Sequence, residues 1–83
     1  MKKSQPLNLV KLRSRLGVTQ VEFAALCGVH PITVSKWERG KADLNSTQKA
    51  MLKHFNRAAG KVNVSEIIAD RGPVAAWAAM FKA

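Results

Sequence analysis

A helical pattern of apolar residues begins directly after Thr19. The apolar residues of this run that share one helical face are Phe23, Ala24 and Cys27. Thr19 is a favoured N-cap residue, and the carboxylate of Glu22 can return a hydrogen bond to it, which completes a capping box. Gly28 follows where a chain leaving a helix adopts a positive φ at little cost. We therefore expect a short helix that starts at about Gln20 and stops at Gly28.

A second helical run follows after two residues. Pro31 suits the first turn of a helix, where its missing N–H is not needed, and Val34 and Trp37 lie three apart on one face. Gly40 is expected to end this helix, and Ala24 is small where the two helices would cross most closely. Two short helices joined by a glycine turn make a helix-turn-helix.

The residues before this unit predict an amphipathic helix from Pro6 to Leu16 that Gly17 closes. Its apolar residues at i, i+3 and i+7 are Leu9, Leu12 and Leu16, and its basic residues on the other face are Lys11 and Arg15.

After the unit, Asn45 or Ser46 can cap a fourth helix that runs to about Ala59 and stops at Gly60. The residues expected to point inward are Met51, Phe55 and Ala58, and those expected to point outward are Lys49 and Lys53.

The remainder of the chain predicts two more helices. A capping box of Asn63 and Glu66 and a hydrophobic staple of Val62 and Ile67 indicate a helix from Val64 to Arg71, closed by Gly72. Pro73 then starts a sixth helix with an apolar stripe, made of Val74, Trp77, Ala78 and Phe81. In an alternative interpretation, residues 61–65 form an edge strand that pairs across a dimer, because Val62 and Val64 alternate.

The central residues resemble the Cro/repressor (Xre-type) DNA-binding domains, which have the lambda-repressor-like fold. The matching positions lie between Leu9 and Arg57 and are Gln20, Glu22, Ala24, Gly28, Val34, the run 37–41 and the preceding run 12–17. The resemblance implies an all-α, five-helix domain whose third helix lies in the major groove, here with an additional C-terminal helix. It also implies a largely buried ion pair between Arg13 and Glu38. Pro31 departs from the family, since many relatives carry a polar base-reading side chain there.

The charge of the chain points to a polyanionic partner. Its 83 residues suffice for one small domain, and 14 Lys and Arg stand against five Asp and Glu, with a pI near 10.5. Residues 1–61 hold twelve basic and three acidic residues, whereas residues 62–83 hold two of each. We therefore expect a DNA-binding domain over 1–61 and a helical extension over 62–83 that packs on the same domain and serves as its dimerisation element.

Other classes of protein fit the sequence less well. Lys2 and Lys3 are not followed by the apolar segment of a signal peptide, and the run 74–81 is far shorter than the roughly twenty residues that span a bilayer, so we expect a cytoplasmic protein. Cys27 is interpreted as a small buried hydrophobe. His30 and His54 have no second ligand at metal spacing, and no catalytic set is visible, so we expect neither metal nor cofactor nor enzymatic activity. The two tryptophans, Trp37 and Trp77, are better explained by core packing than by base stacking.

The outer face of the third predicted helix carries the candidates for reading DNA. With Val34 and Trp37 turned inward, the candidate base readers are Ile32, Thr33 and Lys36. An exposed branched hydrophobe suits the thymine methyl group, and a lysine one turn further on suits guanine O6 and N7. In the alternative, Ile32 is tucked under His30, which could itself cap the helix or contact a phosphate, and Lys36 is merely solvated.

A second set of residues is expected to contact the DNA backbone. Gln20 matches the phosphate-contacting glutamine of the family, at a helix N-terminus that favours anions. The full set is Thr19, Gln20, Ser35, Arg39, Lys41, Ser46 and Thr47. Such contacts give affinity and register rather than sequence preference.

These features predict a sequence-specific transcriptional regulator, a repressor or autorepressor of the phage or prophage type that binds double-stranded DNA at a palindromic operator. A homodimer interface is expected on the uncharged tail, made of Val74, Trp77, Ala78 and Phe81, unless this stripe only caps the core. Two other functions stay open. The chain could be an antitoxin whose tail binds a toxin protein and which represses its own operon, or an adaptor whose basic face binds RNA or an acidic protein.

Overall fold

The computed structural model describes residues 8–82, which form six helices joined by short connections. The helices are α1 (Leu9–Leu16), α2 (Gln20–Cys27), α3 (Pro31–Glu38), α4 (Ser46–Ala58), α5 (Val64–Arg71) and α6 (Pro73–Lys82). The described residues contain no strand, so the predicted all-α fold is confirmed. The alternative strand over 61–65 is wrong, because a turn at Lys61 leads directly into α5.

The predicted helix boundaries hold closely except at the start of α1. Asn8 has extended backbone angles and its side chain accepts a 3.1 Å hydrogen bond from the backbone N–H of Lys11, so α1 begins at Leu9 rather than at Pro6. Pro6 lies outside the described residues, as do Lys2 and Lys3. No described helix is long and apolar enough to cross a membrane.

Local capping explains why the helices start and stop where they do. Thr19 and Glu22 form the predicted capping box, with hydrogen bonds of 3.1 and 2.9 Å, and Gly28 ends α2 with a φ of 72°. Asn45, one of the two predicted caps, and Gln48 form a second capping box at the start of α4. At α5 only half of the predicted box is present, since the Asn63 side chain accepts from the N–H of Glu66.

The core lies between α1, α2, α3, α4, the first residue of α5 and the inner face of α6. Its largest fully buried side chains are Phe23, Phe55, Leu12, Leu52, Met80, Val34 and Val64. Two predicted core positions are wrong in detail: α2 buries Leu26 where Cys27 was expected, and α4 buries Leu52 where Met51 was expected. Cys27 and Met51 pack against the edge of the core and are half-buried. In each pair, two apolar residues are adjacent in the sequence, and tertiary packing determines which of them is buried.

α6 packs on the domain with a different face from the predicted stripe. Ala76 and Met80 are fully buried, whereas Val74, Trp77 and Phe81 are exposed. The assignment of Trp77 to the core is therefore wrong, since 42% of it is exposed, while Trp37 is buried as expected. The small side chain of Ala76 allows α6 to approach its neighbours closely, and the bulky stripe is left on the outside.

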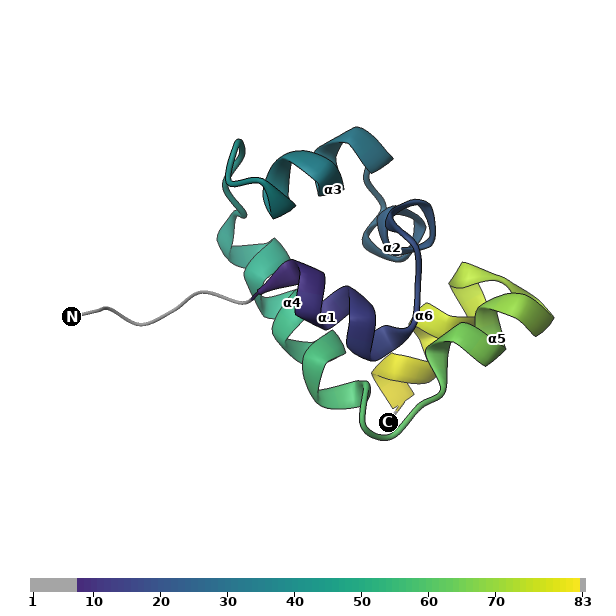
Figure 1. The fold of residues 1–83 in the computed structure, drawn as a ribbon. Coiled ribbons are helices and arrows are strands. Elements are labelled where there is room, and N and C mark those ends of the chain that lie inside the picture. Colours follow the sequence, from purple (N-terminus) through teal and green to yellow (C-terminus); the bar gives the residue numbers. More distant parts are fainter. Residues whose placement is uncertain (1–7, 83) are drawn as a thin grey trace.

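The helices are arranged so that α2 separates α3 from the C-terminal pair. α2 contacts both α3 and α6, and Figure 1 shows α3 and the α5–α6 pair on opposite sides of it. α6 also packs on α4, where a ring nitrogen of His54 lies 2.8 Å from the backbone oxygen of Met80 and its ring stacks on Phe81. α1 lies beside α4, and the Arg15 side chain donates to Asn56.

Candidate nucleic-acid interface

α3 is held by its inner face and presents its outer face to solvent. Val34 is fully buried and Trp37 is 7% exposed, and together they anchor the helix on the core. His30 is the N-cap: its Nδ1 accepts a 3.1 Å hydrogen bond from the backbone N–H of Ile32. The sequence left a cap or a phosphate contact open for His30, and the cap is what the structure shows.

The outer face of α3 carries an exposed hydrophobe among polar groups. Ile32 is 57% exposed and so is not tucked under His30. Lys36, one turn further on, is exposed, whereas Thr33 and Ser35 are half-buried. Single exposed apolar residues are common on protein surfaces, but on this face Ile32 is available to an apolar group of a bound partner.

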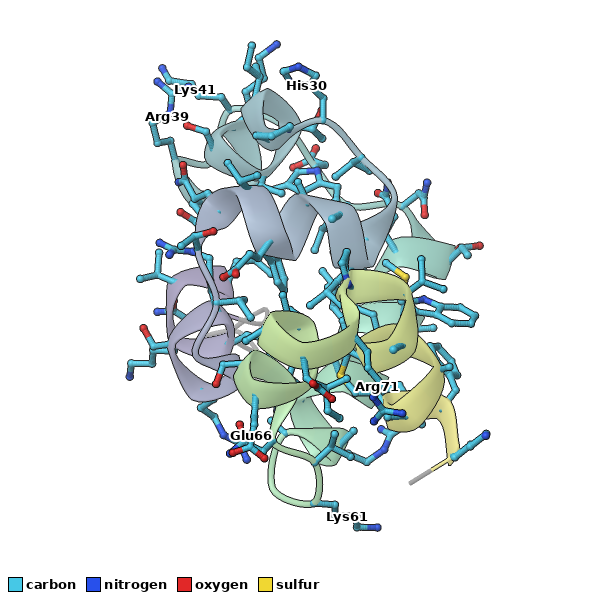
Figure 2. The ribbon with its side chains drawn as sticks, turned by 90° about the vertical axis from the view of Figure 1, so that its right-hand side faces the viewer. His30, Arg39, Lys41, Lys61, Glu66 and Arg71 are labelled. Carbon is cyan, nitrogen blue, oxygen red and sulfur yellow. The ribbon has the colours of Figure 1, made fainter. Side chains whose placement is uncertain are left out.

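Cations surround this end of the molecule. Arg39 and Lys41 follow α3 and are exposed, and Figure 2 shows both near His30 at one end of the protein, with Lys61, Glu66 and Arg71 at the other. Among the described residues, neither they nor Lys36 form an ion pair. Arg39 Nε donates a 3.3 Å hydrogen bond to the backbone oxygen of Ser35. Because this oxygen carries no net charge, the positive charge of Arg39 is not neutralised.

Two acidic residues near this face, Glu38 and Glu22, are engaged inside the domain, whereas Asp43 beyond α3 is exposed. Arg13 Nε donates to Glu38 Oε2 at 2.8 Å, the contact that the family resemblance implied. The Glu38 side chain is 6% exposed and that of Arg13 24%. Glu22 is engaged in the capping box with Thr19. Because these two carboxylates are paired or hydrogen-bonded, the positive potential of the α3 face is preserved.

Gln20 occupies a position that the sequence did not reveal. Its side-chain Nε2 donates to Glu38 Oε1 at 2.7 Å, so this amide is bound to the end of α3. Glu38 therefore joins α1, α2 and α3 through one carboxylate. No spacing rule links positions 20 and 38, and only the tertiary fold brings them together.

The other backbone-contact candidates lie around the same end of the fold. Thr19 precedes α2, Lys41 follows α3, and Ser46 and Thr47 open α4; all four are exposed. Their hydroxyl, ammonium and helix N-terminal N–H groups are donors of the kind that bind phosphate oxygens. The arrangement fits a polyanion lying across α3 from the start of α2 to the start of α4.

Metal ligands and an activated thiol are two groups that would support reaction chemistry. Residues 8–82 contain no group of three or more His, Cys, Asp or Glu side chains that could hold a metal ion. Burial raises the pKa of the Cys27 thiol to about 12, which keeps it protonated and unreactive at neutral pH.

The comparison with known families agrees with this geometry. Residues 9–48 match the profile of the helix-turn-helix family. This segment is a helix-turn-helix domain of the Cro/repressor (Xre) type. The match runs from α1 to the first turn of α4 and includes all of α2 and α3, so it covers every element of the candidate interface. The helix-turn-helix domain makes the chain a DNA-binding transcription regulator. Neither curated proteins nor solved structures gave a match to the chain.

Proposed function

We propose that this regulator is a repressor that binds a palindromic operator as a homodimer and reads it with α3. The observation that carries the proposal is the outer face of α3, where the exposed Ile32 lies one turn from Lys36. In the major groove Ile32 would contact a thymine methyl group and Lys36 would donate to guanine O6 and N7. Thr33 would reach a base edge between them.

Contacts to phosphate would set the register of α3 in the groove. Thr19 and Gln20 at the start of α2 would hold one strand, and Ser46 and Thr47 at the start of α4 would hold a second stretch of backbone. Ser35, Arg39 and Lys41 add contacts between them. Glu38 leaves the Gln20 amide a second N–H for a phosphate oxygen, since an amide nitrogen carries two donors.

The homodimer is proposed to form through the exposed stripe of α6. Val74 is 79% exposed, Trp77 42% and Phe81 45%, and the half-buried Ala78 lies on the same stripe. The rings of Trp77 and Phe81 are 4.5 Å apart and form one aromatic surface. Figure 2 shows α6 on one side of the molecule, below α2 and away from the end that carries Arg39 and Lys41. A two-fold axis along that side would present both α3 helices to the same face of DNA.

A dimer seated on a promoter blocks transcription by occupancy alone, which is why we favour repression. The test is selection from a pool of random duplexes with the purified chain, followed by a promoter reporter. A palindromic consensus that lowers reporter output when the chain is expressed supports the proposal. A consensus without two-fold symmetry, or a rise in output, contradicts it. A protein that co-purifies in equal amount and is lost with Trp77→Ala would favour the antitoxin function instead.

A further inference from the structure

Six basic residues lie outside the α3 face and form a second cationic surface. We call it the basic ridge; its members are Lys11, Arg15, Lys49, Lys53, Arg57 and Lys61. All six are exposed, and among the described residues none forms an ion pair. The ridge thus carries six of the chain's fourteen basic residues without a paired carboxylate.

The packing of α4 explains why these charges share one surface. α4 turns Leu52, Phe55 and Ala58 into the core, and His54 on one flank bonds to α6. Asn56 on the other flank accepts from Arg15 of α1. Only one strip of α4 is left to solvent, and the residues spaced four apart along it are Lys49, Lys53 and Arg57.

α1 continues the same surface. Near its start, Asn8 lines a hollow together with Lys49, and near its end Arg15 reaches Asn56, so α1 and α4 run side by side in the same direction. Lys11 lies one turn before Arg15 on the same face of α1. Two acidic residues line the hollow beside Lys49: Glu38, which is paired with Arg13, and Asp43, which is not within ion-pair distance of that lysine.

The ridge starts at the DNA-reading end of the molecule and leads away from it. Lys49 lies in the first turns of α4, close in sequence to Lys41, which Figure 2 places beside Arg39 at the α3 end. Lys61 lies at the opposite end in the same view. A straight duplex bound at α3 would leave the basic ridge without contacts. A duplex that bends toward the protein beyond the operator would instead run along the ridge.

We propose that the basic ridge binds the phosphate backbone of DNA that flanks the operator on the same duplex. This inference rests on the proposed function, because α3 must first seat the protein at an operator. The negative phosphates of the DNA backbone complement a row of unpaired cations. Because contacts to phosphates do not read bases, the ridge requires no particular sequence in the flanking DNA. Bending the flanks has an energetic cost that depends on their flexibility, so flank composition would tune occupancy of the operator.

The test compares the selected operator in a duplex of about two helical turns with the same operator in one of about four turns. The wild-type chain is expected to bind the longer duplex about tenfold more tightly at low salt, with a steeper salt dependence. Lys53→Gln/Arg57→Gln should lose most of that gain and retain wild-type affinity for the short duplex. The matched control, Arg71→Gln/Lys82→Gln, removes the same charge from the tail and should keep the gain.

Three results would overturn the ridge assignment. The first is an equal loss of the affinity gain in both double variants, and the second is a loss of affinity for the short duplex alone. The third is the same gain in affinity when the flanking DNA is added as a separate duplex that is not joined to the operator. Failure of the proposed function would give a different result, because the wild-type chain would then bind the selected operator and a scrambled duplex of the same length with equal affinity.

Discussion

The side-chain amide of Gln20 donates a 2.7 Å hydrogen bond to the carboxylate of Glu38, which joins the first residue of α2 to the last residue of α3. The second oxygen of the same carboxylate accepts from Arg13 of α1 at 2.8 Å. The crossing of the two helices of the helix-turn-helix is therefore fixed at both ends: by core packing near the turn, and by this carboxylate at the far end of α3.

Removing either charge of the Arg13–Glu38 pair should destabilise the domain. Breaking a buried pair costs about 3–5 kcal/mol and an exposed pair under about 1 kcal/mol, so we expect roughly 2–4 kcal/mol for this partly buried pair. Arg13→Ala should cost at least as much as Glu38→Ala, because it leaves the more deeply buried charge alone. Thermal melts measure this, with an expected fall in Tm of about 10 °C or more.

Asp70→Ala is the matched control for these melts. Asp70 Oδ2 lies 3.8 Å from Arg71 Nε, and the Asp70 side chain is 78% exposed. Removal of this exposed carboxylate should leave the Tm nearly unchanged. Falls in Tm below about 1 °C for both Arg13→Ala and Glu38→Ala would show that the pair contributes nothing to stability.

Trp77→Ala should separate association from folding. The Trp77 ring is exposed and packs on Phe81, so its removal deletes an anchor of the proposed interface without opening the core. We expect a chain with native helical content that sediments as a 9.1 kDa monomer and binds a full palindrome hardly better than a half-site. Val10→Ala, which trims another exposed apolar residue, should leave the wild-type dimer intact. A wild-type chain that is itself monomeric and still binds the palindrome cooperatively would refute the interface.

Alkaline pH should destabilise the protein partly through Cys27. Its pKa is about 12 in the folded chain, against an ordinary value of 9.0, so the unfolded chain releases the proton first as the pH rises. The contribution of Cys27 to the free energy of unfolding is therefore complete below pH 9 and is lost between pH 9 and about 12. Urea unfolding of the wild-type chain and Cys27→Ala should show a shallower alkaline decline in the variant. Identical declines would contradict the assignment.

Lys36 and Lys41 should differ in what their loss does to binding. Lys36→Ala should weaken the operator by roughly 1–3 kcal/mol and relax the preference at one G·C pair, because it removes a base contact. Lys41→Ala should weaken all sequences alike and lower the salt slope by about one, because it removes a phosphate contact. Titrations of operator and scrambled duplexes at several salt concentrations distinguish the two. If both variants behave like Lys41→Ala, α3 does not read bases through Lys36.

The sequence predicted the helices well because their ends are fixed locally. Thr19 with Glu22, Gly28 and Pro31 act on their nearest neighbours, and the structure contains each feature as expected. The box of Asn45 and Gln48 was equally readable from its spacing and was overlooked. At the start of α1, the cap is Asn8, two residues after the predicted start at Pro6, and the N-cap preference of this asparagine was overlooked.

The faces of the helices were harder to predict, because they depend on what each helix packs against. α6 is apolar on several sides, so its periodicity suits the face of Ala76 and Met80 as well as that of Trp77 and Phe81. Tertiary packing selects the face with the small residue. The hydrogen bond from Gln20 to Glu38 has no local signal at all.

Sequence-specific reading by α3 is tested by a competition titration of the purified chain between the selected operator and a scrambled duplex of equal length, at fixed salt. We expect a preference of about a thousandfold or more for the operator, which is the range of specific over non-specific binding, and a large reduction of that preference in Ile32→Ala and Lys36→Ala. Equal affinity of the wild-type chain for the two duplexes would contradict sequence-specific reading by α3.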